Sequence, residues 1–170
     1  MGSANTAALR NAVAVAPEGI DTTLYAGLAQ LPAFNPDDDR DPLPPSVADL
    51  RGQIAASGAV LFCTPEYAGA LPGSLKNLLD WTVGGGEMYG KPVAWINVAA
   101  EGRGVGAQAA LAAVLGYVGA TVVHTACIQL PVTRAVLGLE GLVDQPGVRA
   151  QIARTLELFA EGVRPRPAPS

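Results

Sequence analysis

Residues 64–81, with the sequence TPEYAGALPGSLKNLLDW, decide the fold of this chain, because they join a strand to a loop and the loop to a helix. The apolar run AVLFC at residues 59–63 comes just before and is typical of a parallel strand covered on both faces. Pro65 ends this strand, since proline has no amide hydrogen to donate to a neighbouring strand. Gly69 and Gly73 allow a ligand to approach the backbone, and apolar residues then recur with helical spacing. The stretch therefore predicts a ligand-binding loop at the carboxyl end of a parallel strand.

Patterns typical of helices and strands alternate along the rest of the 170 residues, which predicts a three-layer α/β fold with a doubly wound parallel sheet. We expect strands at residues 22–25, 59–63, 92–99 and 121–130, and helices at residues 4–15, 47–57, 72–83 and 148–163. A further alanine-rich helix is expected to follow the loop at residues 100–106 and to end near residue 118. Residues 1–163 are predicted to form a single domain, and the proline-rich residues 164–170 a flexible tail.

Composition and charge argue against several classes of function. The net charge is −4 and the eleven basic residues are scattered, which argues against a nucleic-acid partner, because phosphate binding needs clustered Lys and Arg. No stretch reaches the roughly 18 consecutive apolar residues of a membrane helix, so no membrane partner is expected. The first twenty residues lack the basic start and apolar core of a signal peptide. We therefore expect a cytoplasmic protein.

The side chains that often bind metals or act as acids and bases are poorly arranged in this sequence. Residues 37–39 are three adjacent aspartates without the interleaved spacing of a calcium loop, and Cys63 and Cys127 lack CxxC spacing, so no metal site is predicted. His124 is the only histidine and lies inside a predicted strand, where a core or interface role is favoured. A hydrolase that uses Cys63 as its nucleophile is disfavoured, because Cys63 lacks the flanking glycines of a strained nucleophile turn.

The stretch from Thr64 to Trp81 resembles the second flavin-binding loop of the NADPH-dependent FMN reductase family, a flavodoxin-like group that also contains azo, quinone and chromate reductases. In that family a T-P-E-Y segment wraps the flavin ring with main-chain groups, and a P-G-x-L-K-N-x-x-D-W helix follows. Both patterns are unbroken here. The resemblance extends from Gly2 to about Val123 and implies a flavodoxin-like doubly wound parallel sheet.

The resemblance implies FMN as the cofactor and NADPH or NADH as the co-substrate. No catalytic side chain is implied, because N5 of the flavin accepts the hydride. The residues implied in cofactor binding are Ser3, Asn5 and Thr6 for the phosphate, Pro65, Glu66, Tyr67 and Ala68 for the ring, and Gly102, Arg103 and Gly104 in a third loop. Ser3 and Asn5 are equally well explained as helix N-caps, and Arg103 is only a modest signal for a ribose phosphate.

The chain departs from the family pattern at its start. A family member begins with a strand that runs into a G-S-x-R-x-x-S-x-N phosphate loop, whereas the given sequence starts inside that loop. We therefore expect a sheet that lacks the family's first strand and a phosphate site that lacks half of its loop.

Two functional hypotheses follow from these observations. The leading one is an NAD(P)H-dependent FMN oxidoreductase that passes electrons to a quinone, azo compound, flavin or similar small-molecule acceptor. The alternative is a non-catalytic, truncated flavodoxin-like module for binding or oligomerisation. In either case the resemblance implies a homodimer or homotetramer, with an apolar contact expected at Leu78, Trp81, Val83 and Met88.

Overall fold

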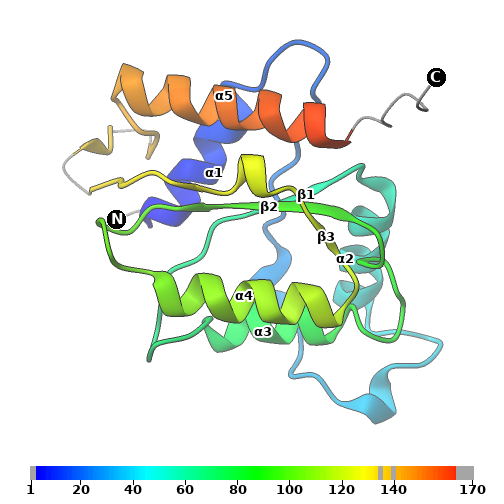
Figure 1. Ribbon diagram of the computed structural model, residues 1–170. Coiled ribbons are helices and arrows are strands. Elements are labelled where there is room, and N and C mark those ends of the chain that lie inside the picture. Colours follow the sequence, from blue (N-terminus) through cyan, green and yellow to red (C-terminus); the bar gives the residue numbers. More distant parts are fainter. Residues whose placement is uncertain (1–2, 134–135, 139–140, 164–170) are drawn as a thin grey trace, which may run out of the picture.

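A parallel four-stranded sheet forms the middle layer of the fold (Figure 1). The computed structural model describes residues 3–133, 136–138 and 141–163. The strands are β1 (Val60–Phe62), β2 (Pro92–Asn97), β3 (Thr121–Val122) and β4 (Ile128–Gln129). β2 is central, because it pairs in parallel with β1 along one edge and with β3 and then β4 along the other.

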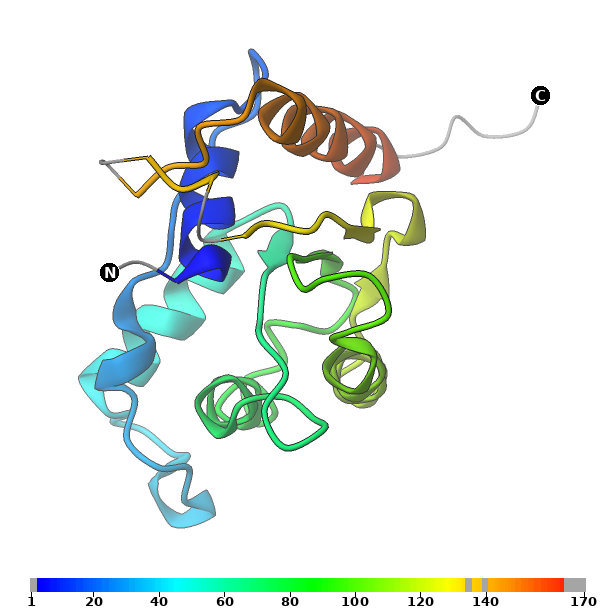
Figure 2. The same cartoon turned by 90° about the vertical axis from the view of Figure 1, so that its left-hand side faces the viewer.

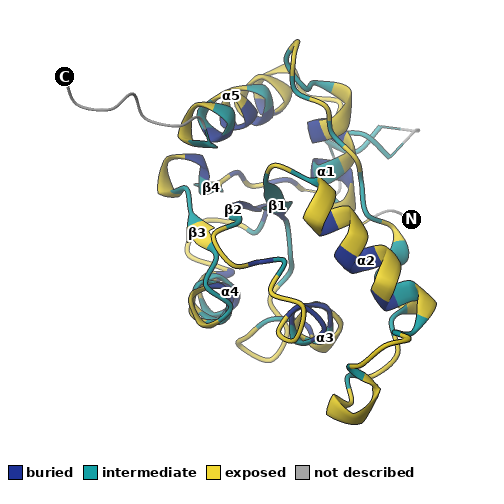
Figure 3. Ribbon diagram, turned by 90° about the vertical axis from the view of Figure 1, so that its right-hand side faces the viewer, coloured by how far each residue is buried: buried dark blue, intermediate teal, exposed yellow. Residues whose placement is uncertain are grey.

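Helices cover both faces of this sheet (Figures 1 and 2). On one face α1 (Ala4–Ala14) packs against α5 (Pro146–Val163), and on the other face lie α3 (Gly73–Asp80) and α4 (Val105–Tyr117). The remaining α-helix of the described residues, α2 (Pro45–Ala56), lies beside β1 (Figure 3). Two 3-10 turns, η1 (Gly27–Gln30) and η2 (Pro36–Asp38), interrupt the long connection before α2. The predicted helices are confirmed, with ends that differ by up to three residues.

The core lies between the layers, as the buried positions in Figure 3 indicate. Every residue of β2 after Pro92 is buried, because helices cover both faces of the strand. One apolar cluster joins α2, α3 and α4 to the sheet around Trp81 and Leu79, and a second joins α1 and α5 around Ile96 and Ile152. These two clusters fix the positions of the helix starts that border the carboxyl ends of the strands.

The strand predicted at residues 22–25 does not form, and this correction has a structural reason. Residues 21–26 are irregular, and in the described part of the chain they make no backbone–backbone hydrogen bond. β1 pairs with β2 on one side, and no other described strand lies along its outer edge. Residues 22–25 do not pair with this free edge, and apolar or β-branched side chains alone do not make a strand.

The strand predicted at residues 121–130 is also wrong, because it is interrupted in its middle. Val122 lies opposite Val93 of β2, and Ile128 lies opposite Ile96. The two paired positions are therefore six residues apart in this segment but only three residues apart in β2. A continuous strand paired with β2 could not contain the three extra residues. The 3-10 helix η3 (His124–Ala126) contains the extra residues.

Two further expectations change with the fold. His124 is exposed on η3, so it is not a core histidine. Of the four residues expected at an apolar subunit contact, Leu78, Trp81 and Met88 are buried within the chain itself, and only Val83 is exposed. The pattern that suggested a contact surface is mainly the inner face of α3 and of the turn after it, where Trp81 packs edge-on against Phe34.

The structure also bears on the expected lack of a membrane helix and on the predicted tail. Within the described ranges, no helix combines the length and the apolar character needed to cross a membrane. The tail expected at residues 164–170 lies outside the described residues.

Candidate functional site

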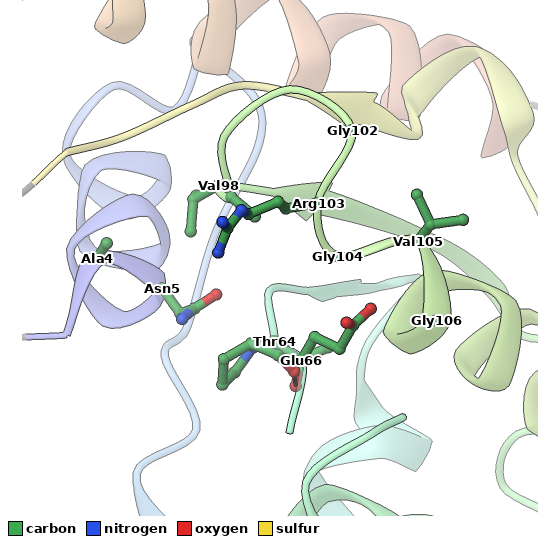
Figure 4. A pocket seen from close by; sticks show the side chains of 12 residues that line it. Ala4, Asn5, Thr64, Glu66, Val98, Gly102, Arg103, Gly104, Val105 and Gly106 are labelled. Carbon is green, nitrogen blue, oxygen red and sulfur yellow. Dashed lines mark hydrogen bonds between the residues drawn. The ribbon is translucent and has the colours of Figure 1, made fainter. Parts of the chain in front are cut away.

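An open pocket of about 580 Å³ lies at the carboxyl ends of β1 and β2 (Figure 4). This is the edge of an open α/β sheet at which ligands usually bind, and the volume is in the range of small-molecule sites. Three segments line it: the start of α1, the loop after β1, and the loop between β2 and α4. The lining residues are Ala4, Asn5, Thr64, Pro65, Glu66, Val98, Ala99, Gly102, Arg103, Gly104, Val105 and Gly106.

A tight reverse turn follows the loop after β1. The backbone groups of Tyr67 and Ala70 exchange two hydrogen bonds of 3.0 Å each. Ala68 and Gly69 at the centre of the turn have φ values of 51° and 75°. Glycine adopts this left-handed conformation freely, whereas alanine there costs about 1–2 kcal/mol. The turn presents Tyr67 to solvent, with 65% of its surface exposed.

Two side-chain amides hold the loop between β2 and α4. Asn97, the buried last residue of β2, donates from Nδ2 to the carbonyl of Arg103 at 2.9 Å and accepts at Oδ1 from the amide of Ala99 at 3.0 Å. Gln129 of β4 donates from Nε2 to the carbonyls of Ala99 and Ala100 at 3.2 and 2.9 Å. The loop is therefore fastened at both ends to the strands beneath it.

Gly104 is the one position of this loop where glycine is required on two counts. Its φ of 79° lies in the left-handed region. A Cβ atom at this position would also lie 2.7 Å from the side-chain amide atoms of Asn97. The loop can therefore cross close above Asn97 only because residue 104 has no side chain.

Glu66 connects the two loops of the pocket. Its Oε2 accepts a hydrogen bond of 3.1 Å from the backbone amide of Ala107 in the first turn of α4. In the described part of the chain, the amides of Gly104, Val105 and Gly106 donate to no backbone or side-chain acceptor. These three residues line the pocket at the N-terminus of a 13-residue helix, where the helix dipole favours negative charge.

The opposite wall of the pocket is the start of α1. Ser3 is the N-cap residue, but its side chain makes no capping hydrogen bond. Asn5 lines the pocket, and its Oδ1 accepts a hydrogen bond of 3.4 Å from the Cys63 thiol. Burial raises the pKa of the Cys63 thiol to about 12, so at neutral pH this cysteine is not a thiolate nucleophile.

Arg103 brings a positive charge to the pocket. Its side chain is exposed and points across the opening of the pocket toward Asn5 (Figure 4). Glu66 lies on the other side of the same opening. The pocket thus combines one cation, one carboxylate and a row of free amides. The described residues contain no group of three His, Cys, Asp or Glu side chains that is placed to hold a metal ion.

The structure brings together six of the ten residues that the sequence indicates. Asn5, Pro65, Glu66, Gly102, Arg103 and Gly104 line the pocket. The other four, Ser3, Thr6, Tyr67 and Ala68, lie in the adjoining segments and do not line it.

Asn97 and Gln129 are supporting residues that the sequence analysis did not identify. Both come at the ends of strands, and this position in the chain is the only signal for them. A polar residue at the end of an apolar strand is common, so the signal is weak without the structure.

Comparisons with known proteins agree with this geometry. Residues 1–132 match the sequence model of the NADPH-dependent FMN reductase family. A solved structure, the flavoenzyme NAD(P)H:(acceptor) oxidoreductase FerB from Paracoccus denitrificans, superposes with a TM-score of 0.74 at 26% identity, over 94% of this chain and 91% of that one. The flavodoxin-like α/β fold expected from the sequence is thereby confirmed.

Curated relatives match over shorter stretches. The NAD(P)H-dependent FMN reductase PA1204 of Pseudomonas aeruginosa is 40% identical over 58% of this chain and 54% of its own length. A probable NADPH:quinone oxidoreductase 2 of Oryza sativa is 37% identical over 47% of this chain and 41% of its own length. The chain therefore spans about half, or less, of the length of these two relatives. The family match covers most of the chain, however, and we conclude that the chain belongs to the NADPH-dependent FMN reductase family.

Proposed function

We propose that this chain binds FMN in the pocket at the carboxyl ends of β1 and β2 and acts as an NAD(P)H-dependent oxidoreductase. The observation that carries the proposal is the row of free amides at Gly104–Gly106, which faces a pocket bounded by the Thr64–Glu66 loop. Flavin requires hydrogen-bond donors near its ring, a slot for the ring, and anion-binding groups for its phosphate.

The residues of the pocket fit these requirements. The free amides at the start of α4 and the backbone of residues 64–66 would supply polar contacts for a flat ring, and Tyr67 on the adjoining turn would supply an aromatic plane at its edge. The N-terminus of α1, with Ser3, Asn5 and Thr6, would hold the phosphate, because a helix N-terminus attracts anions and the Ser3 hydroxyl makes no capping bond. The pocket volume of about 580 Å³ leaves room for the ring and for part of a second substrate.

FMN, when bound, supplies the redox chemistry, since its N5 accepts a hydride and its reduced form gives two electrons to an acceptor. The protein groups bind and orient, and none of them has to transfer a proton. Gly104 lets the third loop cross close above Asn97, because a Cβ there would lie 2.7 Å from the side-chain amide atoms of Asn97, and this loop would border the ring. Arg103, which lines the pocket, would attract a phosphate group of NADH or NADPH.

The acceptor is proposed to be a small molecule such as a quinone or an azo compound. Relatives of this chain carry the names quinone reductase and NADPH azoreductase, which supports an acceptor of this size. We further propose that residues 1–163 act as one domain, that the protein works in the cytoplasm, and that it forms a homodimer or homotetramer.

Flavin titration tests the proposal directly. We expect the purified chain to bind FMN with quenching of flavin fluorescence, and the loaded protein to oxidise NADH or NADPH when benzoquinone is present. Gly104→Ala should weaken FMN binding by at least about tenfold, because it forces a strained φ and a clash with Asn97. Protein that gains no flavin at any FMN concentration would contradict the proposal and favour the non-catalytic module.

A further inference from the structure

The side chain of Glu66 occupies an unusual place for a carboxylate in an FMN pocket. It accepts a hydrogen bond from the Ala107 amide, so it lies at the N-terminus of α4. It also lines the pocket, next to the three amides that donate to no described protein group. A second negative charge at this helix end, such as that of a reduced flavin, would therefore lie close to the charge of Glu66.

The loop that carries Glu66 is pressed against α4 at a second point. A Cβ atom added at Gly106 would lie 2.2 Å from the carbonyl oxygen of Gly69 and 2.9 Å from Oε2 of Glu66. Real Cβ atoms do not approach backbone oxygens so closely, so any side chain at residue 106 must push the two loops apart. Gly106 and Glu66 thus form one contact, which we call the loop latch.

We propose that Glu66 is a positioning residue which fastens the Thr64–Ala70 loop to α4 through the loop latch, and whose charge lowers the reduction potential of bound FMN. The inference rests on the proposed FMN binding and adds a role for one side chain. The positioning part holds in the protein without cofactor, because the latch is formed by the chain alone.

The sign of the electrostatic effect follows from elementary charge interactions. The N-terminus of a helix behaves as about half a positive charge and stabilises an anion. Two-electron reduction by hydride leaves the flavin with more negative charge than the oxidised form, so free amides at Gly104–Gly106 favour the reduced state. The carboxylate of Glu66 opposes this effect, since like charges repel strongly in a partly enclosed site. Removal of its charge should therefore favour reduced FMN.

Glu66→Gln separates the charge from the hydrogen bond, because the glutamine side chain retains an oxygen that accepts from Ala107. We expect this variant to bind reduced FMN more tightly than oxidised FMN by about tenfold relative to the original protein. For a two-electron couple, tenfold corresponds to a midpoint potential about 30 mV higher. Glu101→Gln is the matched control, because Glu101 is exposed in the loop between β2 and α4 and does not line the pocket. The midpoint potential of FMN bound to this control variant should equal that in the original protein.

The latch itself is tested in the protein without FMN. Hydrogen exchange at the Ala107 amide should be about tenfold faster in Glu66→Ala, which leaves this amide without its acceptor, and nearly unchanged in Glu66→Gln. Gly106→Ala should lower the melting temperature and weaken FMN binding. Gly116→Ala should do neither, because residue 116 lies in the same helix with no heavy atom within 4 Å of a Cβ there.

The outcomes separate this inference from the proposed function. If the original protein binds FMN but Glu66→Gln and Glu101→Gln give equal potentials, the electrostatic role of Glu66 is wrong and the proposed function stands. If Glu66→Ala leaves the exchange of the Ala107 amide unchanged, or Gly106→Ala behaves like Gly116→Ala, the latch is wrong. If no variant binds FMN, the proposed function fails, and the hydrogen-exchange result still decides the latch.

Discussion

Asn97 holds the loop between β2 and α4 in place, although Asn97 itself does not line the pocket. Both ends of its amide are used, by the carbonyl of Arg103 and by the amide of Ala99. Asn97→Ala leaves these two backbone groups without their partners, which costs about 1–3 kcal/mol. We expect the free energy of unfolding to fall by this amount in urea denaturation, and FMN affinity to fall by about tenfold or more in titration, because the loop loses its fixed shape.

Asn77→Ala is the matched control for this prediction. Asn77 also uses both ends of its amide, accepting from the amide of Phe34 at 2.7 Å and donating to the carbonyl of Pro32 at 2.8 Å. None of these three residues lines the pocket. The control should lose similar stability and keep its FMN affinity. An equal loss of affinity in both variants would mean that the effect of Asn97 on FMN is only a consequence of global stability.

Cys63 supplies a second prediction at the scale of a residue. Burial raises the pKa of its thiol to about 12, so at pH 8 the folded protein holds far less Cys63 thiolate than the unfolded chain does. In a Cys127→Ala background, alkylation of Cys63 by iodoacetamide should therefore be slower in buffer than in urea by more than about tenfold, as followed by mass spectrometry. A folded-state rate within tenfold of the unfolded rate would contradict this.

The same pKa shift has a defined effect on stability. Because the folded state keeps the thiol protonated to a higher pH than the unfolded state does, the thiol's contribution to the free energy of unfolding is complete below about pH 9. It is lost as the pH rises toward 12. In Cys63→Ala this part of the alkaline loss of stability should be absent, which urea denaturation at pH 8 and at pH 10 can measure.

The helices of this protein could be predicted from the sequence, whereas two of the strands could not, because a strand depends on pairing with another strand. The helices could be predicted because each carries its own apolar face, as Leu75, Leu78 and Leu79 show for α3. Residues 22–25 have strand-like side chains but pair with no described strand, and the segment from β3 to β4 must match a shorter stretch of β2. Both errors concern the neighbouring strand and the pairing register, and these cannot be read from the sequence of one segment alone.

Part of the candidate site could likewise be predicted from the sequence, and part of it could not. Pro65, Gly102 and Gly104 could be predicted, because glycines and a proline directly after apolar strands indicate loops at one edge of a parallel sheet, whereas Glu66 is indicated by the resemblance to the family. The contact between Glu66 and α4 could not be, since the two residues that form it are 41 positions apart in the sequence. Such contacts depend on how two loops fold over each other.

The outer edge of β1 gives a prediction at the scale of elements. This edge has no described partner strand, and unpaired strand edges readily accept another strand. An added N-terminal segment of about five β-branched residues followed by Gly-Ser-x-Arg should pair there and bring further anion-binding groups to the start of α1. We expect stabilisation of at least about 2 kcal/mol, which for a chain of this size raises the melting temperature by about 4–8 °C. FMN should also bind more tightly.

A Gly/Ser extension of the same length is the control, because it cannot add apolar contacts and has little tendency to form a strand. Thermal melts and FMN titrations of the two extended chains should therefore differ. Equal melting temperatures and equal FMN affinities would show that the edge of β1 is already closed by the residues around it.

For the whole molecule, the distribution of exposed apolar side chains bears on assembly. Val83, Tyr89 and Tyr117 are 63%, 82% and 94% exposed. Tyr89 lies against Gly119, where an added Cβ would be 2.6 Å from its ring, so it is close to the end of α4 that carries Tyr117. We call Tyr89 and Tyr117 the tyrosine patch. Tyrosine is enriched in subunit interfaces, whereas single exposed apolar residues elsewhere need no partner.

The tyrosine patch leads to the prediction that the protein forms oligomers through this end of α4, and not through the buried residues Leu78, Trp81 and Met88. Light scattering at micromolar concentration should give a mass at least twice that of the 17.3 kDa chain. Tyr89→Glu combined with Tyr117→Glu should shift the protein toward monomer, because it places charge in the contact. Val13→Glu, at a 42% exposed position on α1, should not. A monomeric original protein, or an equal effect of both changes, would exclude the patch as the interface.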